Sequence, residues 1–327
     1  MQFDYPLERL RVHSPELTVP ADFEAFWSDT LARAREHPID VRLEEVDLGF
    51  PGMRVFDVSF AGFAGDRINA WLRLPNRSDD DRPLPGFVQF HGYRGGRGFP
   101  HEPQLWPQAG VAHLAVDTRG QGGSWTAGST PDPHGGTNAE TAGWLTRGVS
   151  SPASYYYRRV FTDAVRAVEA MRSIPEVDPE RVFAGGVSQG GGIALAVAGL
   201  LDDLPGVVAD VPFLSDFPEA LALASDSSTG YGEIIQYLTI HREQEKSVLN
   251  TLSYFDVANL VTRAQAPAFV SVALMDAVCA PRTVFAAFNR YRGEDKEIAV
   301  YPYNGHEGGG ALQAWRAVEW VRSRCAA

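Results

Sequence analysis

Short apolar runs without polar alternation recur from residue 86 onward, and most are separated by segments long enough to form a helix. Strands that are buried on both faces and alternate with helices are typical of a parallel sheet with right-handed crossovers. The pattern therefore predicts an α/β fold, in which helices flank a mostly parallel, twisted sheet. The runs are GFVQFHG (86–92), VAHLAVDTRG (111–120), RVFAGGVS (181–188), VVADVPF (207–213), PAFVSVALMD (267–276) and EIAVYPYNG (297–305), and the clearest helical segments are 154–174 and 193–204.

The first part of the chain has a different pattern. Residues 20–37 carry apolar side chains at helical spacing behind Asp22, the candidate N-cap, and so predict a helix. Residues 53–62 and 68–75 alternate apolar and polar positions across a short glycine-containing connection, which predicts a hairpin. The polar residues 76–83 are expected to form an exposed loop. The apolar positions of the helix are Phe23, Phe26, Trp27, Leu31 and Ala34.

Two stretches interrupt the alternation of strands and helices. Residues 118–150 are rich in Gly, Thr, Ser and Pro and are expected to form a long loop beside the sheet. Residues 214–262 have a helical pattern and lie between two predicted strands, as an inserted cap would. We find no internal repeat or low-complexity linker. One domain is therefore expected over residues 1–327, with an N-terminal extension at about 1–50 and a cap at about 214–262.

Composition narrows the classes of partner. Hydrophobic residues make up 44% of the 327 residues and charged residues 21%, the balance of an ordinary globular protein. The net charge of −12 would repel nucleic-acid phosphates and anionic lipids, so neither partner is expected. Two cysteines do not provide a disulfide framework. The N-terminal MQFDYPLERL lacks the pattern of a secretory signal, and no apolar run reaches the length of a membrane span, so a cytoplasmic location is expected.

Ser188 stands in the segment Gly186-Val187-Ser188-Gln189-Gly190, which matches the G-x-S-x-G pattern of a nucleophile elbow. In a chain with 32 glycines such a match also arises by chance, and a flexible turn is the alternative. The context favours a nucleophile, because Ser188 follows a predicted strand and precedes a predicted helix. Ligand sites of open parallel sheets lie at that end of the strands, and a helix N-terminus favours developing negative charge.

A serine hydroxyl needs a base, and the chain has eight histidines. His306 follows the last predicted strand on a glycine-flanked loop, which makes it the expected base. An H-E-x-x-H zinc site is excluded at both His-Glu pairs, since Leu105 and Gly310 occupy the second ligand position. The other histidines are assigned to peripheral segments (His13, His37), the pair His101-Glu102, the core of a strand (His113), the long loop (His134), the cap surface (His241) and a glycine-rich loop (His91).

An acid is needed to orient the imidazole and to stabilise its charged form. Asp276 ends a predicted strand and lies between Ser188 and His306 in sequence. The order serine, aspartate, histidine is that of α/β-hydrolases, so Asp276 is the expected acid. Asp210 and Asp216 remain rivals, because they end or follow the preceding strand.

Acyl transfer also requires two N–H groups that stabilise the oxyanion. One is expected from Gln189, the residue after the nucleophile. The other is expected from Tyr93, in the loop HGYRGGRG that follows an early strand, with His91 supporting that loop. A flexible glycine loop without a catalytic role is the alternative.

Several motifs now coincide with one family. The chain resembles the acetyl xylan esterase/cephalosporin C deacetylase family, carbohydrate esterase family seven, over nearly its whole length. The diagnostic features are Arg119-Gly120-Gln121, the elbow from Gly186 to Gly191, and the pair His306-Glu307, in that order. Further matching segments are PLERL, PADFEAFWSDTL, HGYRGGRG, LWPQAGVAHLAVDTRGQG, VPFLSDF, TLSYFDVANL, LMDAVCAPRTVFAAFN and YPYNGHEGGG.

The resemblance implies an α/β-hydrolase fold and metal-free ester hydrolysis by Ser188, His306 and Asp276, without a cofactor. Oxyanion donors would be the N–H groups of Tyr93 and Gln189. It also implies short acyl groups, chiefly acetyl, on acetylated xylo-oligosaccharides or at the 3′ position of cephalosporins. Members of the family are commonly hexamers whose entrances face an internal cavity, so a homo-oligomer is expected.

The resemblance also suggests residues that support the site. Arg119 and Gln121 would fix the long loop near the site without taking part in the chemistry, and a buried arginine there usually bonds carbonyl groups. Val278, Gly230 and Tyr231 would line or support the substrate pocket. Thr229-Gly230-Tyr231 stands where relatives often have a proline before the aromatic residue, which predicts a wider acyl pocket. The order of small residues in RGQGGSW also departs from the family.

Three other functions are compatible with parts of this pattern. The first is a peptidase of the same fold, in which Glu233 and Asp226 of the cap would bind a substrate amine. The second is an esterase with another acyl specificity. The third is a non-catalytic binding protein that retains the fold, which the presence of every triad member disfavours.

Overall fold

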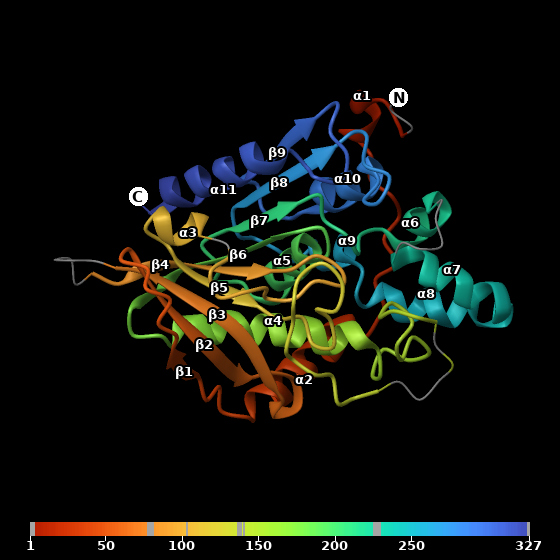
Figure 1. Cartoon of the computed structure of the whole chain (residues 1–327). Coiled ribbons are helices and arrows are strands. Elements are labelled where there is room, and N and C mark those ends of the chain that lie inside the picture. The colour runs from red at the N-terminus through yellow and green to blue at the C-terminus, as the bar shows by residue number, and fades with distance from the viewer. Residues whose placement is uncertain are drawn as a thin grey trace.

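The computed structural model describes residues 4–76, 82–102, 104–135, 139, 141–224 and 230–325. Within these residues nine strands form one sheet in the order β1-β2-β3-β5-β4-β6-β7-β8-β9 (Figure 1). The pairs from β1 to β5 are antiparallel, and all pairs from β5 onward are parallel. The mostly parallel sheet predicted above is thus confirmed. The strands are β1 Arg42–Glu45, β2 Met53–Ala61, β3 Arg67–Pro75, β4 Leu84–Phe90, β5 Ala112–Val116, β6 Val177–Val187, β7 Val207–Asp210, β8 Ala268–Ala273 and β9 Lys296–Tyr301.

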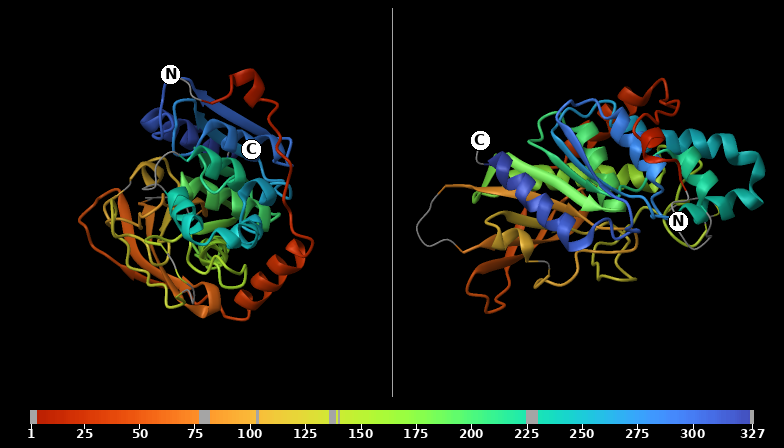
Figure 2. Two further views of the ribbon diagram at one scale, coloured as in Figure 1. Left: turned by 90° about the vertical axis from the view of Figure 1, so that its right-hand side faces the viewer. Right: turned by 90° about the horizontal axis from the view of Figure 1, so that it is seen from above.

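Helices cover both faces of the sheet (Figure 2). Trp106 of α3 and Trp320 of α11 belong to the core on one face, and α4, α5, α9 and α10 contribute to the larger core. The α-helices are α1 Leu7–Leu10, α2 Phe23–Arg35, α3 Leu105–Gln108, α4 Tyr156–Arg172, α5 Gln189–Leu200, α6 Phe217–Leu223, α7 Gly230–Ile240, α8 Glu245–Ser253, α9 Val257–Leu260, α10 Pro281–Arg290 and α11 Gly310–Cys325, with 3₁₀ turns η1 Phe63–Gly65 and η2 Arg242–Gln244.

The predicted N-terminal helix is α2, and its apolar face is buried. Trp27 also donates its indole N–H to the carbonyl of Tyr254 (3.0 Å). Asp22 occupies the N-cap position, but its side chain does not cap the helix. It accepts a hydrogen bond from the hydroxyl of Tyr254. The capping prediction was therefore right in position and wrong in mechanism, because a tertiary partner takes the carboxylate.

The predicted hairpin is β2 and β3, paired continuously from Met53↔Pro75 to Ala61↔Arg67. The predicted long loop is present as well. Between β5 and α4 the described residues contain one isolated bridge, Gly123↔Ala127, and no helix or strand. The loop is held by the buried carboxylate of Asp117, which accepts the N–H groups of Ser129 and Thr130. It is thus tied down at its start.

Helices α6, α7, α8 and α9 lie within the stretch interpreted above as a cap. The first three gather at one end of the molecule, the end towards which the arrowheads of β6, β7 and β8 point (Figure 1). The loops that follow β4, β6, β8 and β9 open towards the same end, and they carry Tyr93, Ser188, Asp276 and His306. Topology alone therefore brings the four predicted site residues to one edge of the sheet.

Candidate active site

Ser188 occupies a sharp turn between β6 and α5. Its φ of 59° and ψ of −121° lie in a backbone region that residues other than glycine rarely adopt. The turn is held by the N–H of Ser188, which donates to the carbonyl of Asp210 (2.8 Å). Glycines make the turn possible, because a Cβ on Gly186 or Gly190 would lie 2.5 or 2.2 Å from the carbonyl oxygen of Phe90. The close approach to Phe90 requires glycine at both positions. A tightly packed nucleophile elbow needs such glycines, whereas a flexible turn does not.

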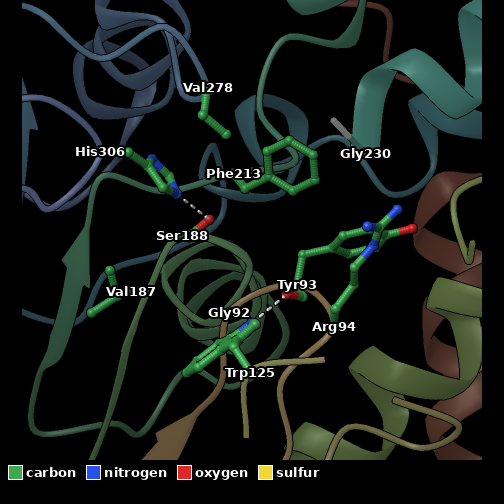
Figure 3. A pocket seen from close by; sticks show the side chains of 10 residues that line it. All are labelled: Gly92, Tyr93, Arg94, Trp125, Val187, Ser188, Phe213, Gly230, Val278 and His306. Atoms are coloured by element: carbon green, nitrogen blue, oxygen red, sulfur yellow. Dashed lines mark hydrogen bonds between the residues drawn. The ribbon is translucent and has the colours of Figure 1, made fainter. Parts of the chain in front are cut away.

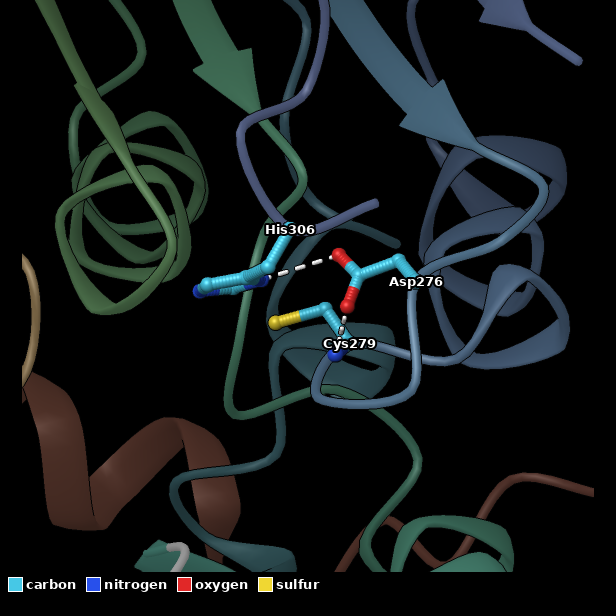
Figure 4. Close-up of side chains that lie close together, drawn as sticks. All are labelled: Asp276, Cys279 and His306. Atoms are coloured by element: carbon cyan, nitrogen blue, oxygen red, sulfur yellow. Dashed lines mark hydrogen bonds and ion pairs between the residues drawn. The ribbon is translucent and has the colours of Figure 1, made fainter. Parts of the chain in front are cut away.

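His306 connects Ser188 with Asp276. Its Nε2 lies 3.0 Å from Ser188 Oγ and its Nδ1 lies 2.9 Å from Asp276 Oδ2 (Figures 3 and 4). A carboxylate accepts hydrogen bonds, so Nδ1 carries the proton and Nε2 is free to accept the proton of the serine hydroxyl. The structure thus brings together three side chains that are far apart in the sequence, in the order that transfers a proton away from Ser188.

Asp276 is fully buried and held by the loop that contains it. Its Oδ1 accepts the N–H groups of Val278 (2.8 Å) and Cys279 (3.0 Å), which directs Oδ2 at the imidazole. The two rival acids have other partners. Asp210 accepts a hydrogen bond from Gln313 (2.7 Å), and burial raises the pKa of its carboxyl to about 6. Asp216 lies at the N-terminus of α6. Among the described residues, neither side chain bonds to the imidazole.

The expected oxyanion donors are Gln189, which follows Ser188 in the chain, and Tyr93, which lines the same cavity. Gln189 is the first residue of α5, so its N–H has no partner within the helix. The Gln189 side chain is buried and fixes this end of the helix, since it accepts from the hydroxyl of Tyr157 (2.8 Å) and donates to the carbonyl of His91 (3.1 Å). Tyr93 lines the cavity above Ser188 (Figure 3). Their roles as donors remain predictions.

Glu233 on α7 holds the loop of Tyr93 in place. Its buried carboxylate accepts the hydroxyl of Tyr93 (2.6 and 2.7 Å) and the N–H of Leu145 (2.9 Å). The same hydroxyl accepts the N–H of Trp144 (2.8 Å). Burial and the neighbouring Glu233 carboxylate raise the pKa of Tyr93, which stays protonated and donates. Gly143 makes room, because a Cβ there would collide with the carboxylate.

Glu233 therefore joins three segments, the cap, the long loop and the loop of Tyr93. No pattern in the sequence predicted this role. The interpretation of Glu233 as an acid for a substrate amine stays a prediction, and the bonds from Tyr93 and Leu145 to its oxygens argue against it. Asp226, the second acid of that interpretation, lies outside the described residues.

A cavity of about 410 Å³ opens in front of Ser188 and His306. Its walls are mainly apolar, and Trp125 and Phe213 face each other across it (Figure 3). The lining residues are Gly92, Tyr93, Arg94, Trp125, Val187, Ser188, Phe213, Gly230, Val278 and His306. A small ester fits such a space, with its carbonyl near the serine and its apolar groups against the walls.

Comparisons with known proteins identify the family of the chain. A sequence model described as acetyl xylan esterase (AXE1) matches residues 1–324. The chain belongs to the acetyl xylan esterase family. It is 28% identical over 301 residues to the acetyl esterase Axe7A of Xylanibacter ruminicola, a match that covers 90% of this chain and 66% of that protein. The chain thus spans slightly less than two thirds of the length of this curated relative.

Solved structures of acetyl xylan esterases resemble the whole chain. The enzyme from Paenibacillus sp. R4 is 35% identical with a TM-score of 0.91, and acetyl xylan esterase 1 from Thermoanaerobacterium sp. JW/SL YS485 is 33% identical with a TM-score of 0.89. Each match covers 98% of this chain and 99% of the other. An acylaminoacyl peptidase from Pyrococcus horikoshii, 14% identical with a TM-score of 0.58 over 84% of this chain and 41% of that one, shares the fold. The predicted α/β-hydrolase fold is confirmed.

In this member of the acetyl xylan esterase family, the Arg-Gly-Gln motif acts on the loops around the site. Arg119 is fully buried and bonds the carboxylates of Asp163 (2.6 and 2.8 Å) and Asp66 (2.8 Å). The expected carbonyl partners were therefore wrong, because acids from distant segments reach the guanidinium, with Asp132 as a third at 3.5 Å. Gln121 accepts the N–H of Arg94 (2.7 Å) and donates to the side chain of Gln189 (2.9 Å). It links the loop of Tyr93 to the elbow.

The predicted pocket residues divide into two groups. Val278 and Gly230 line the cavity, whereas Tyr231 lies behind its wall. The ring of Tyr231 packs on Phe213 with centroids 4.1 Å apart, and its oxygen accepts the N–H of Leu214 (3.0 Å). Tyr231 is thus a support of the wall. Thr229 lies outside the described residues, so the predicted widening of the pocket stays a prediction.

The other histidines have structural surroundings. His113 is buried and contacts Arg73 (3.3 Å) and Gln89 (2.7 Å), as expected of a packed residue. Burial lowers the pKa of His91 to about 4, which keeps it neutral beneath the loop of Tyr93. His134 lies 2.8 Å from Asp66.

Cys279 adds a thiol beside the triad. The ligand atoms of Asp276, Cys279 and His306 all lie within 4.8 Å of one another, a spacing that could suit a soft cation (Figure 4). Burial raises the pKa of the Cys279 thiol. With its proton donated to Asp276, Nδ1 of His306 has no lone pair for a cation, so a proton-transfer site accounts for the arrangement.

Among the described helices, none is long and apolar enough to cross a bilayer.

Proposed function

We propose that this chain is a serine esterase that removes acetyl and similar short acyl groups from acetylated xylo-oligosaccharides, cephalosporin C and other small esters. The observation that carries the proposal is the position of His306 between Ser188 Oγ and Asp276 Oδ2, at the base of an apolar cavity. Membership of the acetyl xylan esterase family supports the acetyl group as the acyl part.

The proposed reaction has two acyl transfers. Ser188 Oγ attacks the ester carbonyl carbon while His306 Nε2 takes the hydroxyl proton, and the carbonyl oxygen becomes an oxyanion. The N–H groups of Tyr93 and Gln189 stabilise this oxygen. The imidazolium then gives its proton to the departing sugar oxygen as the C–O bond breaks. Water, deprotonated by His306, attacks the acyl-serine and releases the acid, which restores the serine hydroxyl.

Asp276 stabilises the imidazolium throughout this cycle. Its Oδ1 is bonded by two backbone N–H groups, so the carboxylate keeps its direction when the imidazole gains charge. Burial removes water that would otherwise compete for Oδ2. The family resemblance further supports a hexameric assembly, and we include it in the proposal together with a cytoplasmic location.

Replacement of the nucleophile tests the function. Ser188→Ala is expected to lower the kcat for 4-nitrophenyl acetate by about 10⁴-fold or more, since the residual rate of such variants comes from binding and the oxyanion hole. Ser28→Ala, at an exposed position of α2, is the matched control and should keep the parental rate. A fluorophosphonate should label the parent and the control but not Ser188→Ala. Near-parental turnover in Ser188→Ala would end the proposal.

The acyl and alcohol parts need separate assays. A series of 4-nitrophenyl esters of increasing chain length reports acyl preference, and acetylated xylobiose and cephalosporin C report the alcohol. Faster hydrolysis of aminoacyl naphthylamides than of acetyl esters would instead favour the peptidase. The buried carboxylate of Glu233 already accepts hydrogen bonds from Tyr93 and Leu145, which argues against that outcome.

A further inference from the structure

A second cavity adjoins the candidate active site. It has a volume of about 420 Å³, close to that of the first, and both are lined by Trp125. Its other described lining residues come from two loops, 98–102 and 122–127. Cavities of this size bind small molecules, and Trp125 is shared with the space in front of Ser188.

The two exposed aromatic residues of this cavity are held in place. Trp125 is 58% exposed, yet its indole N–H donates to the carbonyl of Tyr93 (2.8 Å) (Figure 3). One side of its ring rests against the main chain, since a Cβ on Gly95 would lie 2.4 Å from it. Phe99 is 55% exposed, and the ring of His101 stacks against it.

The loop of Phe99 is anchored from below. The guanidinium of the buried Arg73 donates hydrogen bonds to the carbonyls of Phe99 (2.9 Å) and Pro100 (3.0 Å). The indole N–H of Trp71 donates to the carbonyl of Gly98 (2.9 Å). The N–H of Gly98 donates to Ala127 on the opposite loop (2.9 Å). The walls of the cavity are therefore fixed, and a ligand would bind without first ordering them.

The chemistry of the cavity selects a neutral ligand with many hydroxyl groups. Glu102 carries the one charge among its described lining residues, and its carboxylate lies over Gly98. A carboxylate accepts hydrogen bonds from hydroxyl groups and repels anions. Exposed aromatic faces suit the apolar C–H face of a pyranose ring. Nucleotides, sugar acids and cephalosporins, which are anionic, do not fit this combination.

We propose that the second cavity binds the sugar residue next to the acetylated one, so that the preferred substrate is a neutral oligosaccharide of at least two pyranose units. Trp125 and Phe99 would stack on pyranose rings, and Glu102 would accept hydrogen bonds from their hydroxyl groups. This proposal rests on the esterase function proposed above, because the first sugar must place its acetyl group at Ser188.

Phe99→Ala tests the proposal, because Phe99 lines the second cavity and does not line the first. It is expected to raise the KM for acetylated xylobiose about fivefold, with kcat nearly unchanged, as the loss of one stacked ring would. The kinetics on 4-nitrophenyl acetate, acetylated xylose and cephalosporin C should stay within twofold. Phe99→Tyr, which keeps the ring, should behave as the parent. Trp315→Ala, another exposed aromatic on α11, is the control and should change none of these values.

Binding gives a readout that does not depend on turnover. Xylotriose titrated into Ser188→Ala should change the intrinsic tryptophan fluorescence, and the additional change Phe99→Ala should weaken the apparent affinity about fivefold. If the parent binds xylotriose in this way but hydrolyses no acetyl ester, the proposed function fails and the sugar site stands. An unchanged KM and affinity in Phe99→Ala would overturn the sugar site. An equal rise of the KM for 4-nitrophenyl acetate would also overturn it. So would a changed oligomeric mass of Phe99→Ala, since that would show that Phe99 lies at a subunit interface.

Discussion

At the scale of single residues, the site depends on which hydrogen-bond partner each acid has. Asp210 is the last residue of β7 and Asp276 follows the neighbouring strand β8, and both are buried. Two backbone N–H groups hold the carboxylate of Asp276 so that it faces His306. The carboxylate of Asp210 instead accepts a hydrogen bond from Gln313 of α11. One of two similar acids is therefore available to the imidazole.

This difference predicts opposite results for two matched variants. Asp276→Asn is expected to lower kcat for 4-nitrophenyl acetate by about 10⁴-fold, because an amide cannot stabilise the imidazolium and favours the wrong tautomer. Asp210→Asn should retain activity within about tenfold, since its side chain does not reach His306. Steady-state kinetics on both purified proteins, with circular dichroism to verify folding, decide the matter. A larger loss in Asp210→Asn would reverse the assignment of the acid.

At the scale of elements, the cap helix α7 forms part of the framework of the site. Glu233 on this helix bonds Tyr93 of the loop after β4 and Leu145 of the long loop. The loop after β4 is bonded in turn to Gln121, which reaches the elbow through Gln189. Three loops and a helix are thus coupled through side chains that do not touch the reacting atoms.

We expect Glu233→Ala to lower kcat for 4-nitrophenyl acetate by about tenfold with a smaller effect on KM, since a displaced Tyr93 loop would weaken transition-state binding. Glu233→Gln retains one acceptor oxygen and should be less affected. Glu243→Gln, an exposed glutamate of η2, serves as the control. A loss of thermal stability without a change in kcat would show that Glu233 supports only the fold.

At the scale of the whole molecule, buried acids make stability depend on pH. Asp216 begins α6 with a φ of 52°, and Asp256 accepts its N–H (2.8 Å) together with that of Phe217. Burial, and then the neighbouring charge of Asp256, raise the pKa of Asp216 from 3.8 to about 7. Glu219 raises this pKa further and Arg282 lowers it. The folded protein therefore keeps a proton that the unfolded chain loses between about pH 4 and pH 7.

The free energy of unfolding should consequently fall as the pH rises through this window. Asp216→Asn removes the titrating carboxyl, and asparagine tolerates the positive φ at this position. The free energy of unfolding of this variant should fall less between pH 4.5 and 8 than that of the parent, by roughly 1–3 kcal/mol. Urea denaturation at several pH values measures the effect. Asp29→Asn, at an exposed position of α2, should keep the parental dependence. An identical slope in Asp216→Asn and the parent would contradict the assignment.

Features set by chain order and local pattern could be predicted, and features set by long-range partners could not. The alternation of apolar runs and helices predicted the sheet, and the order of Ser188, Asp276 and His306 predicted which residues the sheet brings together. The carboxylate partners of Arg119 could not be predicted, because Asp163 is 44 residues away on α4. The true partner of Asp22 is 232 residues away. The strand β6 begins at Val177, earlier than predicted, since Asp178, Pro179 and Glu180 interrupt the apolar pattern at its start.

The attachment of Glu233 has a consequence for how substrates enter. If helix α7 moved away from the site, Glu233 would lose its hydrogen bonds to Tyr93 and Leu145, and the wall of the cavity formed by the loop of Tyr93 would lose its support. We therefore expect the entrance to Ser188 to keep its width, so that substrates are selected by size and shape before any bond is broken. Such an enzyme suits short, freely diffusing fragments better than intact polymer.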